Sequence, residues 1–272
     1  MGREIPSSTE DNLILTSENT PVILQSIGQR REHPEIIGNS EEILIPQIRD
    51  LRHQSENLGD LTTVLTLFQE ELLCAQHMIM ESKTSNPIRA GKGLLLMTSI
   101  SKDMSSFQKE NKDKIDPIVN ARTFRFLGRQ ADQLHQYPKS EKLYQQGLNF
   151  FENLNNPDQR CHRLELSGFL AFSQLKQNNP AWFDLTIKTL SDFDEAPEGI
   201  WLKDNDYYTW AVWKSGIEIR NSDSLLGNKS NAIEYRTNII SWLNDADSIL
   251  RVSSINPQIR LDELAQVQSK LK

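Results

Sequence analysis

The hydrophobic positions along most of the chain recur every three or four residues, the spacing that places them on one face of a helix. One stripe of this kind runs through 58–80, and the next helix is expected over about 87–112. Pro87 and Pro117 stand where the pattern restarts, and proline suits the first turn of a helix because it has no N–H to donate. We therefore expect residues 43–120 to form N-terminal helical hairpins.

The same spacing continues through the second half of the chain, where all the Trp and Tyr residues lie. One aromatic segment, 201–213, is also compatible with a strand, but the steps from Tyr207 through Trp210 to Ile217 fit a helix equally well. We expect a helix over 206–220, because strand patterns are poor elsewhere. These aromatic residues either pack into the core or form an interaction surface, since Trp and Tyr dominate binding energies at interfaces.

The negative charge of the chain is concentrated at its front. The chain has 30 Lys and Arg residues against 37 Asp and Glu, a net charge of −7. Residues 1–42 alone hold three basic and eight acidic residues, a net charge of −5. Because this segment is also rich in Pro, Ser and Asn, we expect an acidic, largely flexible leader over 1–42. Short apolar pieces inside it, such as Val22-Ile23-Leu24, can still dock as brief elements.

Composition also excludes several classes of protein. Only 12 glycines and few valines argue against a doubly wound α/β fold, which needs glycine-rich loops and valine-rich strands. The acidic balance argues against nucleic-acid binding, and the apolar runs are too short to span a membrane. Cys74 and Cys161 form neither a disulfide framework nor a metal-binding spacing. No secretory signal is recognisable, so we expect a cytoplasmic protein.

The sequence contains only incomplete versions of known catalytic and ligand-binding motifs. Gly91-Lys92-Gly93 lacks the earlier glycine, the following Ser or Thr and the preceding strand of a phosphate-binding loop. No two of the five histidines have the spacing of a helical zinc site, and Cys161 and His162 are neighbours that point apart on a helix. We therefore expect no catalytic residue, no metal and no cofactor. A helical enzyme whose site assembles only in three dimensions remains the alternative.

One segment, 121–157, carries the pattern of a known helical repeat. An aromatic residue, a Leu-Gly pair, a small residue and a second helix with small and aromatic positions follow one another without a gap. The matching residues are Phe124, Leu127, Gly128, Ala131, Leu134, Tyr137, Ser140, Tyr144, Gly147 and Leu148. The segment resembles a tetratricopeptide repeat (TPR), a helix-turn-helix unit of about 34 residues. An ordinary pair of antiparallel helices is the alternative interpretation.

A weaker copy of the pattern follows over 162–195, where the Leu-Gly pair is lost. The resemblance implies antiparallel helical hairpins stacked as a TPR-like solenoid over 121–272, with the amphipathic segment 257–271 as its C-terminal capping helix. It also implies a protein-protein interaction module, that is, a scaffold, adaptor or regulator that binds a peptide or partner segment in a groove. A peptide-sensing regulatory protein is a related alternative. The oligomeric state and the identity of the partner do not follow from the sequence.

In TPR proteins the first helix of each repeat lines the binding groove. The resemblance places six residues of this chain there, namely Arg122, Arg125, Arg129, Asp132, Gln133 and Arg163. The three arginines within 122–129 recur at three- and four-residue steps, so they share one helix face. Guanidinium groups bind carboxylates through paired hydrogen bonds, so we expect an acidic partner segment, or the acidic leader as an intramolecular ligand. The alternative is an ordinary solvated helix face.

Overall fold

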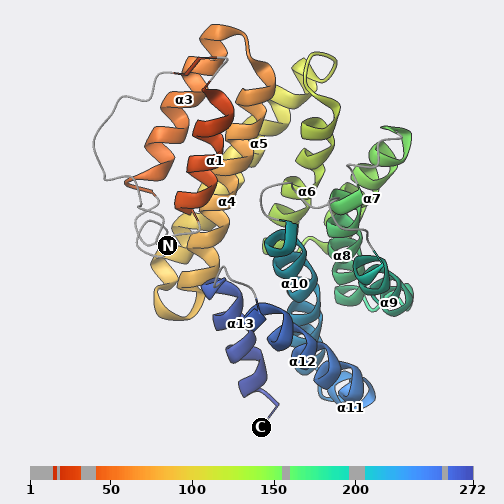
Figure 1. The fold of residues 1–272 in the computed structure, drawn as a ribbon. Helices are drawn as coiled ribbons and strands as arrows, with labels where there is room; N and C mark the ends of the chain where they lie inside the picture. The colour runs from red at the N-terminus through yellow and green to blue at the C-terminus, as the bar shows by residue number, and fades with distance from the viewer. Residues whose placement is uncertain are drawn as a thin grey trace. The chain divides into compact units, whose positions relative to one another are not determined.

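The computed structural model describes residues 15–16, 19–31, 41–154, 160–195, 206–252 and 257–271 of the chain. Within these ranges the regular elements are all helices, which confirms the expected all-α class (Figure 1). In chain order they are α1 (Thr20–Arg31), α3 (Leu44–Leu58), α4 (Leu61–Ser85), α5 (Pro87–Asn111), α6 (Pro117–Gln133), α7 (Tyr137–Leu154), α8 (Arg160–Lys176), α9 (Ala181–Asp194), α10 (Asp206–Leu226), α11 (Lys229–Glu234), α12 (Arg236–Val252) and α13 (Gln258–Ser269). In the described part of the chain, none of them has the length and apolar character needed to cross a bilayer.

The chain divides into two compact units between Leu96 and Met97, a position inside α5. The composition instead suggests a boundary near residue 120, because aromatic residues become frequent beyond it. α6 passes through that position without interruption, since it begins at Pro117 and ends at Gln133. The two positions differ because contacts between side chains define a compact unit, whereas composition reports only which side chains are available.

In the first unit, α3 and α4 pack along each other and α1 lies against both. Aliphatic side chains form their common core, and Ile23 and Ile27 of α1 belong to it. The segment expected to be a largely flexible leader therefore includes a docked helix. Residues 1–14 and 32–40 of that segment lie outside the described residues. Gly59 follows α3 with a φ of 73°, a left-handed conformation that ends the helix and suits glycine.

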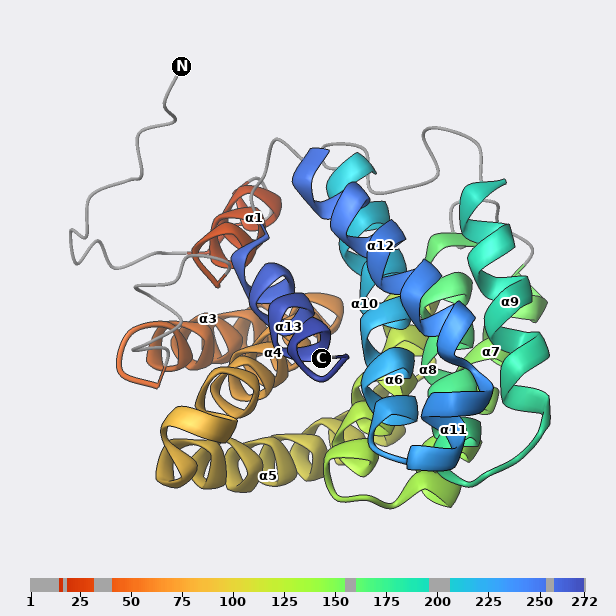
Figure 2. The same ribbon diagram turned by 90° about the horizontal axis from the view of Figure 1, so that it is seen from below.

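In the second unit, helices that follow one another pair as hairpins. α6 packs against α7, α8 against α9, and α10 against α12. The first helices of these pairs also contact one another, α6 with α8 and α8 with α10, while α13 packs on α10 and α12. Figure 2 shows α6, α8 and α10 next to one another, with α7 and α9 on the far side of α6 and α8. Side chains of α6, α8 and α10 are therefore able to meet.

A glycine sets how closely the two helices of the α6–α7 hairpin approach. A methyl group added to Gly128 would lie 2.2 Å from Cε1 of Tyr144, far inside van der Waals contact. Tyr144 is fully buried, and its ring stacks on that of Phe169 of α8 with the centroids 5.5 Å apart. A larger residue at position 128 would push the helices apart, so the small residue of the repeat pattern has a packing reason here.

One helix is longer than the sequence predicts. α10 continues to Leu226, six residues beyond the helix expected over 206–220. Asn221 is fully buried and donates from Nδ2 to the Thr186 hydroxyl oxygen of α9 at 3.1 Å, and Leu225 is fully buried as well. Asparagine usually favours turns because its side chain competes for backbone hydrogen bonds. Here the Nδ2 group of Asn221 donates to a neighbouring helix instead of competing for its own backbone, and the helix continues.

Two of the aromatic residues in the 201–213 cluster pack against the core of the second unit. Trp210 and Trp213 lie against its buried side chains, and the indole N–H of Trp210 donates to the carbonyl oxygen of Phe193 at 3.1 Å. The core interpretation therefore holds for these two residues. The structure does not describe the other three side chains of the cluster, which are those of Trp201, Tyr207 and Tyr208.

Candidate functional site

An ion pair links the first helices of two neighbouring hairpins. Arg125 lies on α6 and Glu165 on α8, 40 residues apart in sequence. Nε and Nη2 of Arg125 approach Oε1 of Glu165 at 2.9 and 2.8 Å, and Glu165 is 7% exposed. Burial lowers the pKa of Arg125, and the charge of Glu165 opposes that shift by favouring the cation. The carboxylate therefore helps to keep Arg125 charged on the side of α6 that faces α8.

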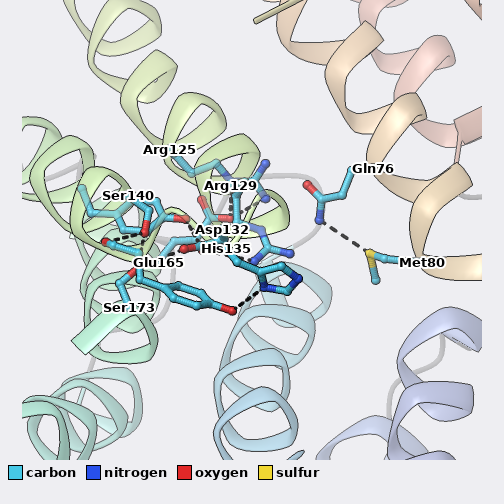
Figure 3. A network of polar contacts seen from close by, with 11 residues as sticks. Gln76, Met80, Arg125, Arg129, Asp132, His135, Ser140, Glu165 and Ser173 are labelled. Carbon is cyan, nitrogen blue, oxygen red and sulfur yellow. Dashed lines mark hydrogen bonds and ion pairs between the residues drawn. The ribbon is translucent and has the colours of Figure 1, made fainter. Parts of the chain in front are cut away.

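Asp132 of α6 is the centre of a second set of polar contacts (Figure 3). Its Oδ2 accepts a hydrogen bond from the Tyr144 hydroxyl at 2.6 Å and lies 3.5 Å from Nη1 of Arg129. Its Oδ1 accepts a hydrogen bond from the Ser173 hydroxyl at 3.0 Å, and Ser173 shares another of 2.7 Å with Ser140. All of these residues are buried. One carboxylate thus connects α6, α7 and α8.

Three arginines from two helices surround one aromatic ring. The guanidinium carbon of Arg220 on α10 lies 4.2 Å from the ring centroid of Phe169 on α8. The guanidinium carbons of Arg129 and Arg125 on α6 lie 4.8 and 5.4 Å from the same centroid. A cation within about 6 Å of an aromatic ring is attracted to the negative face of that ring. We call Arg125, Arg129 and Arg220 the arginine cluster.

The arginine cluster holds more positive charge than its acidic neighbours neutralise. Two of its members each have a carboxylate close by, but the described contacts of Arg220 are with the rings of Phe169 and Phe172. Nη1 of Arg220 is buried without a hydrogen-bond partner. Burial, followed by the charges of Arg129 and Arg260, lowers the pKa of Arg220 to about 9. Arg220 is therefore still a cation at neutral pH, although its surroundings disfavour the charge.

Buried guanidinium nitrogens without a hydrogen-bond partner occur on arginines of α6, α10 and α13. They are Nε of Arg122, Nη1 of Arg125, Nε of Arg129, Nη1 of Arg220 and Nε of Arg260. A buried donor that makes no hydrogen bond costs about 1–3 kcal/mol, and a charged one costs more. Donors of one charge that the chain itself does not satisfy suit the binding of an anion.

Three of the six residues that the resemblance places in a groove meet in these contacts. Arg125 and Arg129 belong to the arginine cluster, and Asp132 lies beside Arg129. Arg129 is only 8% exposed and Asp132 only 5% exposed. An ordinary solvated helix face does not describe this part of α6, because these charged groups contact other helices instead of water.

The other three residues lie apart from these contacts. Arg122 is half-buried near His162, whose pKa is lowered by burial and then by the charge of Arg122. Gln133 is half-buried and Arg163 is exposed, and neither joins the contacts around Asp132 or Phe169. On α8 it is Glu165, two positions beyond Arg163, that faces Arg125 of α6.

Three residues of the site were not expected from the sequence, namely Glu165, Phe169 and Arg220. Glu165 and Phe169 are four positions apart on α8, so they lie on the same face of that helix. That spacing is a signal, but it does not say which face is turned to α6. Arg220 stands at the end of the segment expected to be helical, and only the packing of α10 on α8 shows that it meets the ring of Phe169.

Cys161 and His162 lack the properties of a nucleophile and its base. Burial raises the pKa of Cys161 to about 11, so the thiol is protonated at neutral pH and is a poor nucleophile. His162 lies between the rings of Phe151 and Trp213, with centroids 6.0 and 5.8 Å away, and burial lowers its pKa well below the ordinary value. Over the described ranges, no group of three or more His, Cys, Asp and Glu side chains is placed to hold a metal ion.

An open hollow lies between α6 and α7, with a volume of about 390 Å³. Its lining residues are Phe124, Gln146, Asn149 and Phe150. The rings of Phe124 and Phe150 are 6.4 Å apart and tilted relative to each other. Because no charged side chain lines this hollow, its chemistry differs from that of the arginine cluster.

Comparisons with known proteins do not identify a family for this chain. No protein-family model, no curated protein and no solved structure matches it. The assignment of a function therefore rests on the contacts of the described residues.

Proposed function

We propose that the chain is a protein-protein interaction module built from TPR-like helical hairpins, which binds an acidic segment of a partner on the surface of α6, α8 and α10. The observation that carries this proposal is the arginine cluster, whose three cations surround Phe169. Each guanidinium group can donate two parallel hydrogen bonds to a carboxylate. Aspartate or glutamate side chains of a partner would therefore satisfy donors and charges that the chain leaves uncompensated.

The order of the helices supports this proposal. The pairs α6–α7 and α8–α9 follow each other along the chain, and their first helices are neighbours, as in stacked tetratricopeptide repeats. The close approach of Gly128 to Tyr144 agrees with the small residue that the repeat pattern has at this point. In TPR proteins peptides bind to the first helices, and in this chain those helices carry the site.

The spacing of the cations on α6 suits an extended peptide. Arg122 and Arg129 are separated by seven residues of helix, a distance of about 10 Å at 1.5 Å per residue. An extended peptide covers this distance with about three residues. A short run of Asp or Glu residues can therefore reach every arginine on this face of α6.

Binding of a short acidic peptide tests the proposal. A fluorescently labelled peptide of Glu residues is titrated with the full chain, and fluorescence anisotropy follows the binding. A Gln peptide of the same length serves as the uncharged control. We expect saturable binding of the Glu peptide that weakens with added salt, and binding of the Gln peptide that is weaker by about tenfold or more. Equal binding of both peptides would contradict the proposal.

A pair of variants locates the binding on this surface. Arg122→Gln and Arg220→Gln are combined because neither arginine has a described ion pair with a carboxylate, so no buried carboxylate loses its partner. The matched control is Arg236→Gln, which removes an exposed arginine from α12. We expect the double variant to lose most of its affinity for the Glu peptide and the control to retain it. Losses of equal size in both proteins would show a general charge effect and overturn the assignment of the site.

A further inference from the structure

Arg129 and Arg220 contact one aromatic ring from two different helices. Their guanidinium carbons lie 4.8 and 4.2 Å from the centroid of Phe169. Nε of Arg129 and Nη1 of Arg220 are buried without hydrogen-bond partners. Arg129 is 8% exposed, and Arg220 is half-buried. The chain thus holds two neighbouring guanidinium groups with hydrogen-bonding capacity that it does not use.

A third arginine increases the positive charge at this place. The guanidinium group of Arg260 packs against Gly216, where an added Cβ would lie 2.8 Å from its Nη2. Gly216 precedes Arg220 by about one turn of α10, so Arg260 lies on the same side of that helix. Arg260 has Glu263 as its partner, but its charge still disfavours the cation of Arg220. An anion that reached Arg220 would relieve this repulsion.

The nearest described carboxylate is already engaged by other donors. Asp132 accepts hydrogen bonds from Tyr144 and Ser173 at 2.6 and 3.0 Å, whereas Nη1 of Arg129 lies 3.5 Å away. At that separation the hydrogen bond between Arg129 and Asp132 is weak. Asp132 therefore does not saturate Arg129, and although its charge favours the cation of Arg220, no hydrogen bond or ion pair between these two residues is described.

We propose that Arg129 and Arg220 together bind a phosphate monoester, carried by a phosphoserine or phosphothreonine in the partner's acidic segment. This inference rests on the proposed function, because it names the group that this same surface recognises. A phosphate monoester has a charge of about −1.5 to −2 at neutral pH and three strong acceptor oxygens. It can neutralise both guanidinium groups at once, whereas a single carboxylate neutralises only one.

The aromatic ring favours this geometry. All the N–H groups of a guanidinium lie in its plane and point outward from its edges. The attraction to the ring of Phe169 uses no N–H group of either guanidinium, so it leaves their hydrogen-bonding capacity to a ligand. Two guanidinium groups on different helices suit the tetrahedral phosphate, whose oxygens point in several directions, better than a planar carboxylate.

Three peptides that differ at one position separate this inference from the proposed function. The peptides share one acidic sequence and carry Ser, Glu or phosphoserine at the central position, and each is titrated into the full chain by isothermal calorimetry. We expect phosphoserine to bind about tenfold or more tightly than Glu, and Glu more tightly than Ser. Equal affinities for phosphoserine and Glu would overturn the phosphate inference and leave the proposed function in place. Equal affinities for all three, with no binding above a neutral peptide, would overturn both.

Inorganic phosphate and pH give two further readouts of the same site. We expect inorganic phosphate to displace the phosphoserine peptide, because its oxygens make the same contacts, and equimolar chloride to leave the peptide bound. The advantage of phosphoserine over Glu should shrink below about pH 6, where the phosphate takes up its second proton. An advantage that does not change with pH, or an absence of competition by phosphate, would contradict the inference.

Substitutions of Arg220 assign the binding to its side chain. Arg220→Gln should abolish the preference for phosphoserine, whereas the exposed control Arg236→Gln should keep it. Because the repulsion around Arg220 disappears, the thermal midpoint of Arg220→Gln should not fall, as circular dichroism would show. Arg220→Lys keeps the cation without the planar fork and should lose part of the preference. If Arg220→Gln prefers phosphoserine over Glu as strongly as wild type does, the assignment is overturned. If the Gln variant does not fold, Arg220→Lys replaces it, and an unchanged preference in that variant overturns the assignment.

Discussion

At the scale of single residues, the side chain of Tyr144 fills space in the core and also makes a buried hydrogen bond. Its ring fills the space left by Gly128 and stacks on Phe169, and its hydroxyl donates to Asp132. Burial and the negative charge of Asp132 raise the pKa of Tyr144 well above the ordinary value. The hydroxyl is therefore protonated at neutral pH, where it is a hydrogen-bond donor.

The substitution Gly128→Ala tests this close packing. The new methyl group would lie 2.2 Å from Cε1 and 2.6 Å from Cζ of Tyr144. Tyr144 has little freedom to move, because Asp132 holds its hydroxyl and Phe169 holds its ring. We expect the free energy of unfolding, measured by urea denaturation, to fall by about 1–3 kcal/mol.

Gly91→Ala is the matched control for that substitution. Gly91 also lies inside a helix, α5, but an added methyl group would have no atom within 4 Å. Alanine has a higher helix propensity than glycine, so we expect a gain of up to about 1 kcal/mol. Similar losses at both positions would show that the contact with Tyr144 is not what requires glycine at 128.

At the scale of elements, charged side chains join α9, α10 and α12. Lys214 of α10 is 5% exposed, and its Nζ lies 2.7 Å from carboxylate oxygens of both Asp194 on α9 and Asp245 on α12. Glu218, one turn further along α10, is 1% exposed. Burial, followed by its hydrogen bond with Asp245, raises the pKa of Glu218 well above the ordinary value. Protonated Glu218 can thus donate a hydrogen bond to Asp245.

Glu218→Gln should remove a pH dependence of stability that this arrangement creates. Between the unfolded-state pKa of Glu218, near 4.5, and its raised folded-state pKa, the native state holds one proton more than the unfolded state. Stability therefore falls as pH rises through this window, by up to about 1.4 kcal/mol per pH unit. Gln donates a hydrogen bond at every pH. We expect the variant to gain stability relative to wild type as the pH is raised from about 5 to 8 in urea denaturation.

The neighbouring charges do not titrate in this window. Hydrogen bonds that outweigh burial raise the pKa of Lys214 and lower that of Asp245, so both groups stay ionised. The matched control is Asp184→Asn, which removes an exposed carboxylate from α9. Its stability difference from wild type should not change with pH. A difference for Glu218→Gln that is equally flat would contradict the raised pKa of Glu218.

At the scale of the whole molecule, the two compact units can be followed by different signals. All five Trp residues, the first of them Trp182, belong to the second unit, Met97–Lys272. Trp fluorescence therefore reports the unfolding of that unit, whereas far-UV circular dichroism reports the helices of both. This uneven distribution makes it possible to test whether the units unfold separately.

Leu51→Ala should destabilise the first unit alone. Leu51 is 1% exposed in the core that α1, α3 and α4 share, and removing such a side chain costs about 2–5 kcal/mol. We expect part of the dichroism change to move to lower urea while the midpoint by fluorescence stays in place. Leu243→Ala, at an equally buried position in the second unit, should instead move the fluorescence midpoint. Equal shifts of both signals for Leu51→Ala would show that the two units unfold together.

Much of the secondary structure could be predicted because helix periodicity is a local property of the chain. The hydrophobic pattern restarts at Pro87 and Pro117, and these prolines are the first residues of α5 and α6. The segment 257–271, expected to be helical, contains α13. The local pattern predicts too early an end for α10, because Nδ2 of the buried Asn221 donates to Thr186 on another helix. Thr186 is 35 residues away from Asn221 in sequence, so a local pattern does not reveal this contact.

By itself, the sequence determined the all-α class, the first residues of α5 and α6, and the basic face of α6 that carries Arg125 and Arg129. Only the tertiary structure decided that Glu165 pairs with Arg125 and that Arg220 joins Arg129 on the ring of Phe169. The physical reason is the range of the interactions. Periodicity and capping act between residues a few positions apart, whereas charges and rings interact with whatever the packing of distant helices brings within a few ångströms.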